Sequence, residues 1–285
     1  MLEQVKNNSR NTFFSCLVAF FLVNAAQAQE WQIEGAAHLI QHQGSESLPL
    51  AKHSEGFSVG LGYSQYLNDN WSISTGVSYL GTELTFAASG VKGSTMEVDM
   101  ENDPFEFRYN TGYFEESVKW QSFRIPLTVQ YETPGIVRWY LRTGILYGIQ
   151  AGTSKYRQKW NDLNTSGYYQ QWDAELNGPE FAGFGKMGDR HTEGTVKLRN
   201  TFSWIVETGI KQTLSTTNDL YLGLFLEMGL NDMRSSKEAT AQPVQYTPEI
   251  ENPLTLNSVL DQAQYKDKTI TPLTVGFKIR YAFEF

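Results

Sequence analysis

Apolar and polar residues alternate through most of this chain, and the final stretch shows the pattern most clearly. From Leu273 to Phe285 the odd positions are apolar or aromatic, and the even positions are small, polar or charged. A period of two places one set on each face of a β-strand. A long strand with one wholly apolar face and an aromatic end is typical of a strand that crosses a bilayer.

Seven further stretches alternate in the same way, so the chain is predicted to be all-β. The eight predicted strands are Trp31–Gln41, Gly56–Leu67, Trp71–Phe86, Val118–Tyr131, Ile136–Gln150, Thr201–Leu214, Asp219–Asn231 and Ile270–Phe285. In the seventh, Leu222, Leu224 and Leu226 are expected to face lipid. The phase of the third strand changes near Leu80, which a β-bulge or departure from the membrane would explain.

The connections between these strands alternate between short and long. Asn68, Asp69 and Asn70 form one short turn, where Asn and Asp tolerate positive φ, and Pro134-Gly135 favours a type II turn in another; the third covers residues 215–218. The long connections cover residues 43–55, 87–117, 151–200 and 232–269. Short periplasmic turns and long extracellular loops define an eight-stranded antiparallel transmembrane β-barrel. A secreted soluble β-sandwich is the alternative.

The beginning of the chain reads as a cleaved signal peptide over residues 1–28, which leaves residues 29–285 for the barrel. Lys6 and Arg10 precede an apolar run, and Ala26-Gln27-Ala28 fits the small-x-small cleavage rule. Cys16, the single cysteine, lies within this segment, so the mature chain is expected to lack disulfides. No later segment approaches the apolar length of a membrane helix.

Charge and aromatic content narrow the expected partners. A net charge of −8 argues against nucleic acid as a partner. Aromatic residues also recur at one depth of the predicted barrel, the periplasmic interface, where amphipathic rings are favoured. This predicted aromatic girdle consists of Trp31, Trp71, Trp139, Tyr281, Phe283 and Phe285. The expected surroundings are the lipids of the outer membrane of a Gram-negative bacterium.

The inward-facing positions carry an unusual number of charges. They are Glu34, Arg124, Arg138, Arg142, Glu207, Lys211, Glu227, Lys278, Arg280 and Glu284. An eight-stranded barrel has room for side chains but no aqueous channel, and buried charges require partners. Strand adjacency predicts the pairs Arg142–Glu207, Glu227–Lys278 and Glu34–Arg280, which would form a salt-bridged plug. A gated conduit is the alternative.

Two of the long loops are chemically distinctive. The loop after the third strand is acidic, but its spacing matches no EF-hand, and a solvated acidic loop is the simpler interpretation. The loop after the fifth strand carries Tyr156, Trp160, Tyr168, Tyr169, Trp172, Phe181 and Phe184. These aromatic residues either pack as a small extra sheet over the barrel mouth or bind an extracellular glycan, peptide or protein.

The four histidines give little support for catalysis. His38 and His42 are separated by about 13 Å along a strand, too far for one metal ion. His42, His53 and His191 could reach the outer rim, yet no serine or aspartate lies at a spacing that supports a catalytic triad. No metal or cofactor motif is present, and no enzymatic activity is expected.

The fourth and fifth strands resemble a known family. Phe123-Arg124-Ile125-Pro126-Leu127-Thr128-Val129-Gln130-Tyr131 and residues 139–148 are similar to strands of the Bacteroidetes outer-membrane β-barrel proteins, the PorT-like relatives of the OmpA-type transmembrane domain. The resemblance implies an outer-membrane barrel whose terminal Phe285 is read by the barrel-assembly machinery. Some PorT-like proteins are linked to type IX secretion, a role that one motif does not transfer.

The sequence therefore predicts a non-enzymatic outer-membrane scaffold that presents large extracellular loops for structural or binding roles. A transport or secretion component, or a narrow channel, is the second hypothesis. A barrel enzyme that acts on lipid or peptide is the third.

Overall fold

The structure, a computed structural model, describes residues 29–43, 50–52, 54–235, 241–249, 251–263 and 269–284. The predicted signal peptide and Phe285 lie outside these ranges, so the structure does not test either prediction. Within the described ranges no helix is long and apolar enough to cross a membrane.

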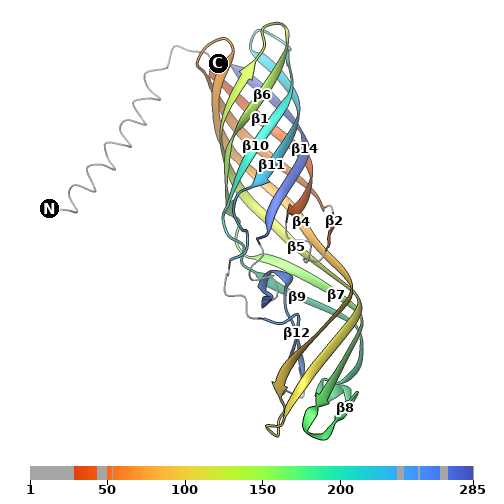
Figure 1. The fold of residues 1–285 in the computed structure, drawn as a ribbon. Helices are drawn as coiled ribbons and strands as arrows, with labels where there is room; N and C mark the ends of the chain where they lie inside the picture. The colour runs from red at the N-terminus through yellow and green to blue at the C-terminus, as the bar shows by residue number, and fades with distance from the viewer. Residues whose placement is uncertain are drawn as a thin grey trace, which may run out of the picture.

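Eight antiparallel strands form a closed ring, which confirms the predicted fold class (Figure 1). They are β1 (Gln29–Gln43), β3 (Ser54–Tyr66), β4 (Trp71–Val98), β5 (Pro104–Glu132), β6 (Val137–Gln150), β10 (Thr201–Thr213), β11 (Asn218–Gly229) and β14 (Thr271–Glu284). β14 pairs with both β1 and β11, and the pairing of β4 with β5 completes the ring. Because closure leaves no unpaired strand edge in the ring, every wall strand can cross a bilayer with its backbone satisfied.

Short turns join the strands at the end of the barrel where β1 begins and β14 ends. Gly135 has φ 128°, as the Pro-Gly turn requires. The Asn68 turn closes differently from the prediction, because no residue in it has positive φ. The Asn68 side-chain oxygen instead accepts the backbone N–H groups of Asn70 and Trp71 at 3.0 and 2.9 Å.

Two of the long connections consist largely of strand rather than irregular loop. β4 and β5 continue as one hairpin far beyond the position predicted for their ends. The connection after β6 contains β7 (Ser154–Tyr169), β8 (Ala174–Leu176), β9 (Gly185–Val196) and the 3₁₀ turns η1 (Gln170–Trp172) and η2 (Glu180–Ala182). We call β4, β5, β7, β8 and β9 beyond the barrel the extracellular sheet.

The extracellular sheet continues the barrel wall away from the periplasmic turns. β5 pairs with β6 as far as Ser122 opposite Gln150, and with β7 from Val118 opposite Tyr156 onward. β9 pairs with β7, and the chain then returns to the barrel as β10. In Figure 1 the barrel occupies the upper part of the view and this sheet extends below it.

One bend crosses the extracellular sheet. Gly90 in β4, Asp162 in β7 and Gly188 in β9 have φ values of 63°, 54° and 65°. A single left-handed residue shifts the alternation by one position, so the buried positions change from even to odd numbers. β5 changes parity at the same level although none of its residues has a positive φ: Phe114, nearer the barrel, and Phe107, farther from it, are both buried.

The remaining elements are β2 (Leu50–Lys52), the hairpin of β12 (Val244–Tyr246) with β13 (Leu254–Leu256), and the 3₁₀ turn η3 (Val259–Asp261). β2 pairs with β4, and Tyr246 of β12 packs against Phe105 and Phe107 of the extracellular sheet. η3 lies at the extracellular mouth of the barrel. Val259 and Leu260 belong to the same apolar cluster as Leu80 and Leu84 of the barrel wall. The extracellular mouth of the barrel is therefore sealed by a packed hydrophobic core.

The change of phase near Leu80 is a change of environment. The registers of β4 with β3 and with β5 stay constant through this point, so the bulge interpretation was wrong. The inner face of β4 changes from Ser74 and Ser78 to Leu80 and Leu84, all buried. Its lipid-facing side ends nearby, since Val77 is an exposed apolar residue and the later odd position is Glu83. β4 therefore leaves the membrane at this level.

Candidate functional site: the charged interior of the barrel

The centre of the barrel is organised around Arg280 of β14, which is fully buried. Its Nη2 lies 2.9 Å from a carboxylate oxygen of Glu207, and its guanidinium lies over the Tyr221 ring at 4.3 Å. Gln32 and Gln130 accept further hydrogen bonds from it at 3.2 and 3.0 Å. Gln32 lies on the adjacent strand β1, whereas the bonds to β5 and β10 cross the lumen and tie distant parts of the wall together.

A second cation, Lys278, shares the same carboxylate. Its Nζ lies 3.2 Å from Glu207 and 3.6 Å from Glu34. The Tyr140 hydroxyl donates to Glu207 at 2.8 Å. Glu207 is therefore the common acceptor of a buried network, a pattern that stabilises charges in a low dielectric.

The ion pairs differ from those predicted by strand adjacency. Glu34 does lie opposite Arg280, and Glu207 opposite Arg142, in the strand registers. However, Glu227 pairs with Arg124 across the lumen at 2.7 Å rather than with Lys278.

Arg142, the predicted partner of Glu207, takes a neutral contact instead. Its Nε donates to the Thr128 hydroxyl at 2.7 Å. The Glu207 carboxylate turns toward Arg280 and Lys278.

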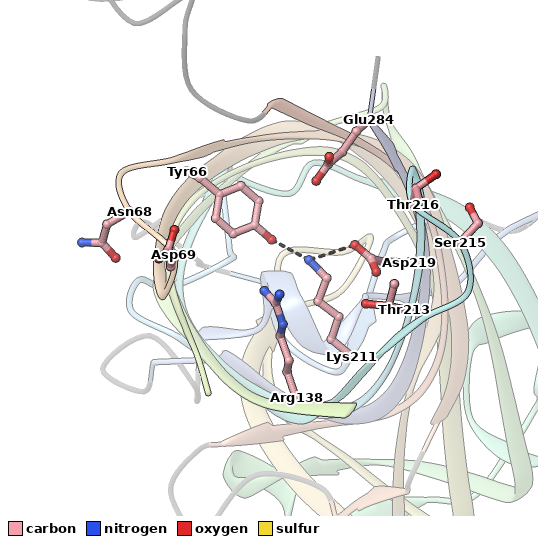
Figure 2. A pocket seen from close by; sticks show the side chains of 10 residues that line it. All are labelled: Tyr66, Asn68, Asp69, Arg138, Lys211, Thr213, Ser215, Thr216, Asp219 and Glu284. Carbon is pink, nitrogen blue, oxygen red and sulfur yellow. Dashed lines mark hydrogen bonds and ion pairs between the residues drawn. The ribbon is translucent and has the colours of Figure 1, made fainter. Parts of the chain in front are cut away.

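A second charge cluster lies at the periplasmic mouth and is centred on Lys211. Figure 2 shows its ammonium between Tyr66 and Asp219, at 2.7 and 3.0 Å. Glu30 and Glu132 lie at 3.2 and 3.4 Å from the same nitrogen. The lysine thus occupies the centre of a ring of oxygen atoms.

The other two predicted mouth residues lie at the edge of this cluster. Arg138 reaches Glu132 at 3.3 Å, and Glu284 lines the rim. Glu30, Asp219 and Glu284 form the one group with metal-binding geometry among the described residues. Because Lys211 lies between Glu30 and Asp219, its own ammonium supplies the cation there.

Cavity volumes show that the interior is closed at mid-height. The cavity at the mouth measures about 510 Å³, whereas that among Arg124, Arg142 and Glu207 measures about 10 Å³. The latter volume accommodates at most one water molecule. Side chains therefore fill the barrel in the described part of the chain, as a plug does.

Several network residues were missed because the predicted strands began or ended at aromatic residues. Glu30 precedes Gln32 and Glu34 by the same two-residue step, and Glu132 follows Gln130 in the same way. Extending each alternation by one step would have found them. The buried tyrosines Tyr66, Tyr140 and Tyr221 were left out because the prediction counted only the charged side chains among the inward-facing positions.

The aromatic residues of the connection after β6 divide into two groups. Trp160, Tyr169 and Phe184 are buried in the apolar cluster, and Tyr156 packs against it. Their packing agrees with an extra sheet rather than with an exposed binding surface. Tyr168 is half-buried beneath Arg108, whose guanidinium lies 4.5 Å from its ring centre.

Trp172 and Phe181 remain exposed, at 61% and 62%. Trp172 stacks on Tyr169 with ring centres 5.2 Å apart. Phe181 lines a groove of about 750 Å³ together with His191 and Leu254. These two side chains are the members of the predicted binding set that a partner can reach.

The acidic segment 87–117, predicted as a loop, lies largely within the β4–β5 hairpin and contains a carboxylate that is not solvated. Glu116 is fully buried and accepts hydrogen bonds from Ser258, Gln158 and the Val259 amide at 2.6, 2.7 and 2.9 Å. Burial raises the pKa of Glu116 to about 7, against the lowering effect of these donors. Glu116 thus tethers η3 to the extracellular sheet, which corrects the prediction of a wholly solvated loop.

The histidines do not converge on one site. His38 is buried beside Phe225 inside the barrel, and His191 lies in the extracellular groove. The side chain of His42 and all of His53 fall outside the described residues. The described pair therefore provides no nucleophile, base and acid arrangement.

The closed antiparallel ring, its lipid-facing apolar band and its charged interior define an outer-membrane β-barrel. A family model described as "Outer membrane protein beta-barrel domain" matches residues 24–235, and the chain belongs to this family. The protein therefore resides in the outer membrane of a Gram-negative bacterium. None of the curated proteins compared with it matches.

Solved structures with a similar arrangement include three barrels. The Neisserial surface protein A is 12% identical with TM-score 0.35, covering 90% of this chain and 97% of that one. OprG from Pseudomonas aeruginosa is 12% identical with TM-score 0.39 (91% and 97%), and Ail of Yersinia pestis is 11% identical with TM-score 0.34 (89% and 98%). At these values the similarities carry no information about what this chain binds.

Proposed function

We propose that this protein is a non-enzymatic membrane scaffold that holds a rigid β-sheet outside the cell for structural or binding roles. The observation that carries the proposal is the continuity of β4 and β5 from the closed barrel into the extracellular sheet. Forces on the sheet are transmitted through the same hydrogen-bonded strands to the barrel wall. The charged plug supplies rigidity because it links β14 to β5 and β10, and β5 to β11, across the lumen.

The contact region in this proposal is the exposed aromatic pair Trp172 and Phe181. Exposed aromatic side chains are frequent anchors for glycan, peptide or protein ligands. The buried members of the aromatic set, such as Trp160, act indirectly by holding the sheet together. Within the outer-membrane β-barrel family, we assign the chain to the PorT-like subgroup on the motif of residues 123–131.

The closed interior disfavours the alternative of a transport component or narrow channel. A conducting pathway would have to displace Arg280 and Lys278 from Glu207 at the same time. Planar-bilayer recording tests this point directly. We expect no stable conductance from the intact chain, and reproducible single-channel openings of constant size would overturn the scaffold proposal.

The binding role requires a comparison in intact outer membranes. In one variant, residues 91–111 would be replaced by a short turn, which removes the distal β4–β5 hairpin but keeps the barrel. A second variant, Trp172→Ala with Phe181→Ala, keeps the sheet. Both are expected to lose the cross-linked adducts of the full chain while the barrel stays resistant to detergent unfolding. Adducts that persist in both variants would contradict binding through this sheet.

A further inference from the structure

A second set of aromatic residues marks the extracellular edge of the lipid-facing band. Tyr79 and Phe123 lie in contact with ring centres 5.6 Å apart, and Tyr147 and Phe202 at 4.7 Å. Amphipathic and aromatic rings favour the interface between hydrocarbon and headgroups. These rings therefore indicate where the outer leaflet ends on β4, β5, β6 and β10.

Basic residues follow directly above this edge on the same outward face. Lys119 lies four positions before Phe123 in β5 and therefore farther from the membrane. The separation is about 13 Å along the strand, or about 10 Å along the membrane normal because the strand is tilted. Lys155 and Arg157 of β7 are exposed beside Lys119. Long cationic side chains at this height can extend to the lipid headgroups.

The three cations outnumber the acids around them. The register that puts Val118 opposite Tyr156 also sets Lys119 beside Lys155, and like charges in this position repel. On its other side Lys119 lies opposite Glu83 of β4, and Arg157 lies opposite Glu193 of β9. Among the described residues neither ammonium has a carboxylate within ion-pair distance; Arg157 alone reaches Glu83, at 3.9 Å.

The three cations border a common cavity of about 250 Å³, which one acid, Glu193, also lines. The excess of positive charge is local, since the chain as a whole has a net charge of −8. An anion in this cavity would relieve the repulsion between the two lysines.

We infer that Lys119, Lys155 and Arg157 form a binding site for phosphorylated lipid headgroups of the outer leaflet. Two observations identify this occupant: the charge complementarity of the cavity, and its continuity with the lipid-facing band below. The headgroup phosphate accepts hydrogen bonds from the two ammonium groups and the guanidinium, while its acyl chains lie along the band near Phe123. The site goes beyond the proposed scaffold role and would exist even if the sheet had no protein partner.

The test uses the full mature chain in nanodiscs of phosphatidylcholine mixed with bisphosphorylated lipid A. Native mass spectrometry measures how much lipid A stays bound. The double variant Lys119→Gln with Lys155→Gln is expected to lower the retention of lipid A about 25-fold. Each cation near a charged membrane surface contributes about five-fold, and the two factors multiply. Lys92→Gln with Lys186→Gln, which removes the same charge beyond the bend, is expected to leave retention unchanged.

Two further lipid conditions separate the possible sources of binding. Dephosphorylated lipid A is expected to be retained no better than phosphatidylcholine, and inorganic phosphate is expected not to displace bound lipid A. Equal retention of dephosphorylated lipid, displacement by inorganic phosphate, or full retention by the Lys119/Lys155 variant would each overturn the inference. A heat-dependent shift in gel mobility establishes that each variant is folded.

Discussion

The membrane part and the extracellular part of this protein share the strands β4 and β5, which have opposite polarity in the two parts. Within the membrane, β5 turns Phe123 and Leu127 outward and Arg124 inward; above it, the same strand turns Lys119 outward and Trp120 inward. The strand geometry does not change at this boundary. What changes is the solvent: lipid accepts only apolar side chains, so the polar residues fill the lumen, whereas water allows the hydrophobic core to return to the inside.

Removing a cation is expected to give the largest difference in unfolding free energy between the two regions. Arg280→Ala would leave Glu207 buried with one fewer partner, which costs about 3–5 kcal/mol of unfolding free energy. Arg108→Ala in the extracellular sheet removes a solvent-screened ion pair with Glu106 and should lower the free energy of unfolding far less. Urea unfolding in detergent micelles measures both. Similar losses in the two variants would show that the lumen network does not behave as a buried one.

A charge on the outward face tests the solvent of each region. Leu224 and Met96 are both outward-facing and exposed, at 63% and 68%. Leu224→Arg is expected to cost about 2–4 kcal/mol because its surroundings are lipid. Met96→Arg is expected to change stability within about ±0.5 kcal/mol because its surroundings are water. Unfolding from lipid vesicles distinguishes them, and a small cost at Leu224 would move β11 out of the membrane.

The smallest expected effect concerns the Glu116 tether and its dependence on pH. The folded pKa of Glu116, about 7, lies above the ordinary carboxyl value of 4.5. Folding therefore favours the protonated form, and the tether is most stable below about pH 4.5 and weakens as pH rises through 7. Hydrogen exchange at the amides of Val259 and Leu260, corrected for intrinsic rates, should quicken between pH 5 and pH 8.

A matched substitution isolates the carboxyl group. Glu116→Gln stays neutral, and the Ser258 hydroxyl can turn to accept from the new amide. Its exchange rates are expected to be slow at both pH values. If the unaltered chain also shows no change with pH, the raised pKa of Glu116 is wrong; the barrel amides serve as an internal reference in either case.

The sequence predicted the fold best where each face of a strand keeps the same surroundings along its whole length. All eight wall strands were predicted because lipid on one side and a lumen on the other enforce a constant period of two. An extra sheet after the fifth strand was among the expectations, but the extension of β4 and β5 into it was missed. The buried positions of β5 change parity there, from the even-numbered Phe114 to the odd-numbered Phe107, and Gly90 marks the same level on β4. A periodic pattern cannot be followed across such a bend without knowledge of its position.

The interior showed a second limit of sequence reasoning. Position along the strand gave the face and approximate depth of Arg124, Glu207 and Lys278, and the structure places these side chains in the lumen. Their partners depend on the barrel diameter and on side-chain reach across it. Arg124 and Glu227 meet across the lumen from strands that are not neighbours, a contact that adjacency does not indicate.

The central claim, that one strand reverses its polarity at the outer membrane boundary, can be tested most directly by a nitroxide scan of β5. The only cysteine of the sequence, Cys16, lies in the predicted signal peptide, so single cysteines can be placed at each position from 115 to 130 of the chain in vesicles. Accessibility to oxygen and to a water-soluble nickel complex then reports lipid and water. We expect oxygen to dominate at 123, 125, 127 and 129, nickel to dominate at 115, 117 and 119, and neither to reach the even positions. Nickel access at the even positions from 124 to 130, or oxygen access at 117 and 119, would contradict the account.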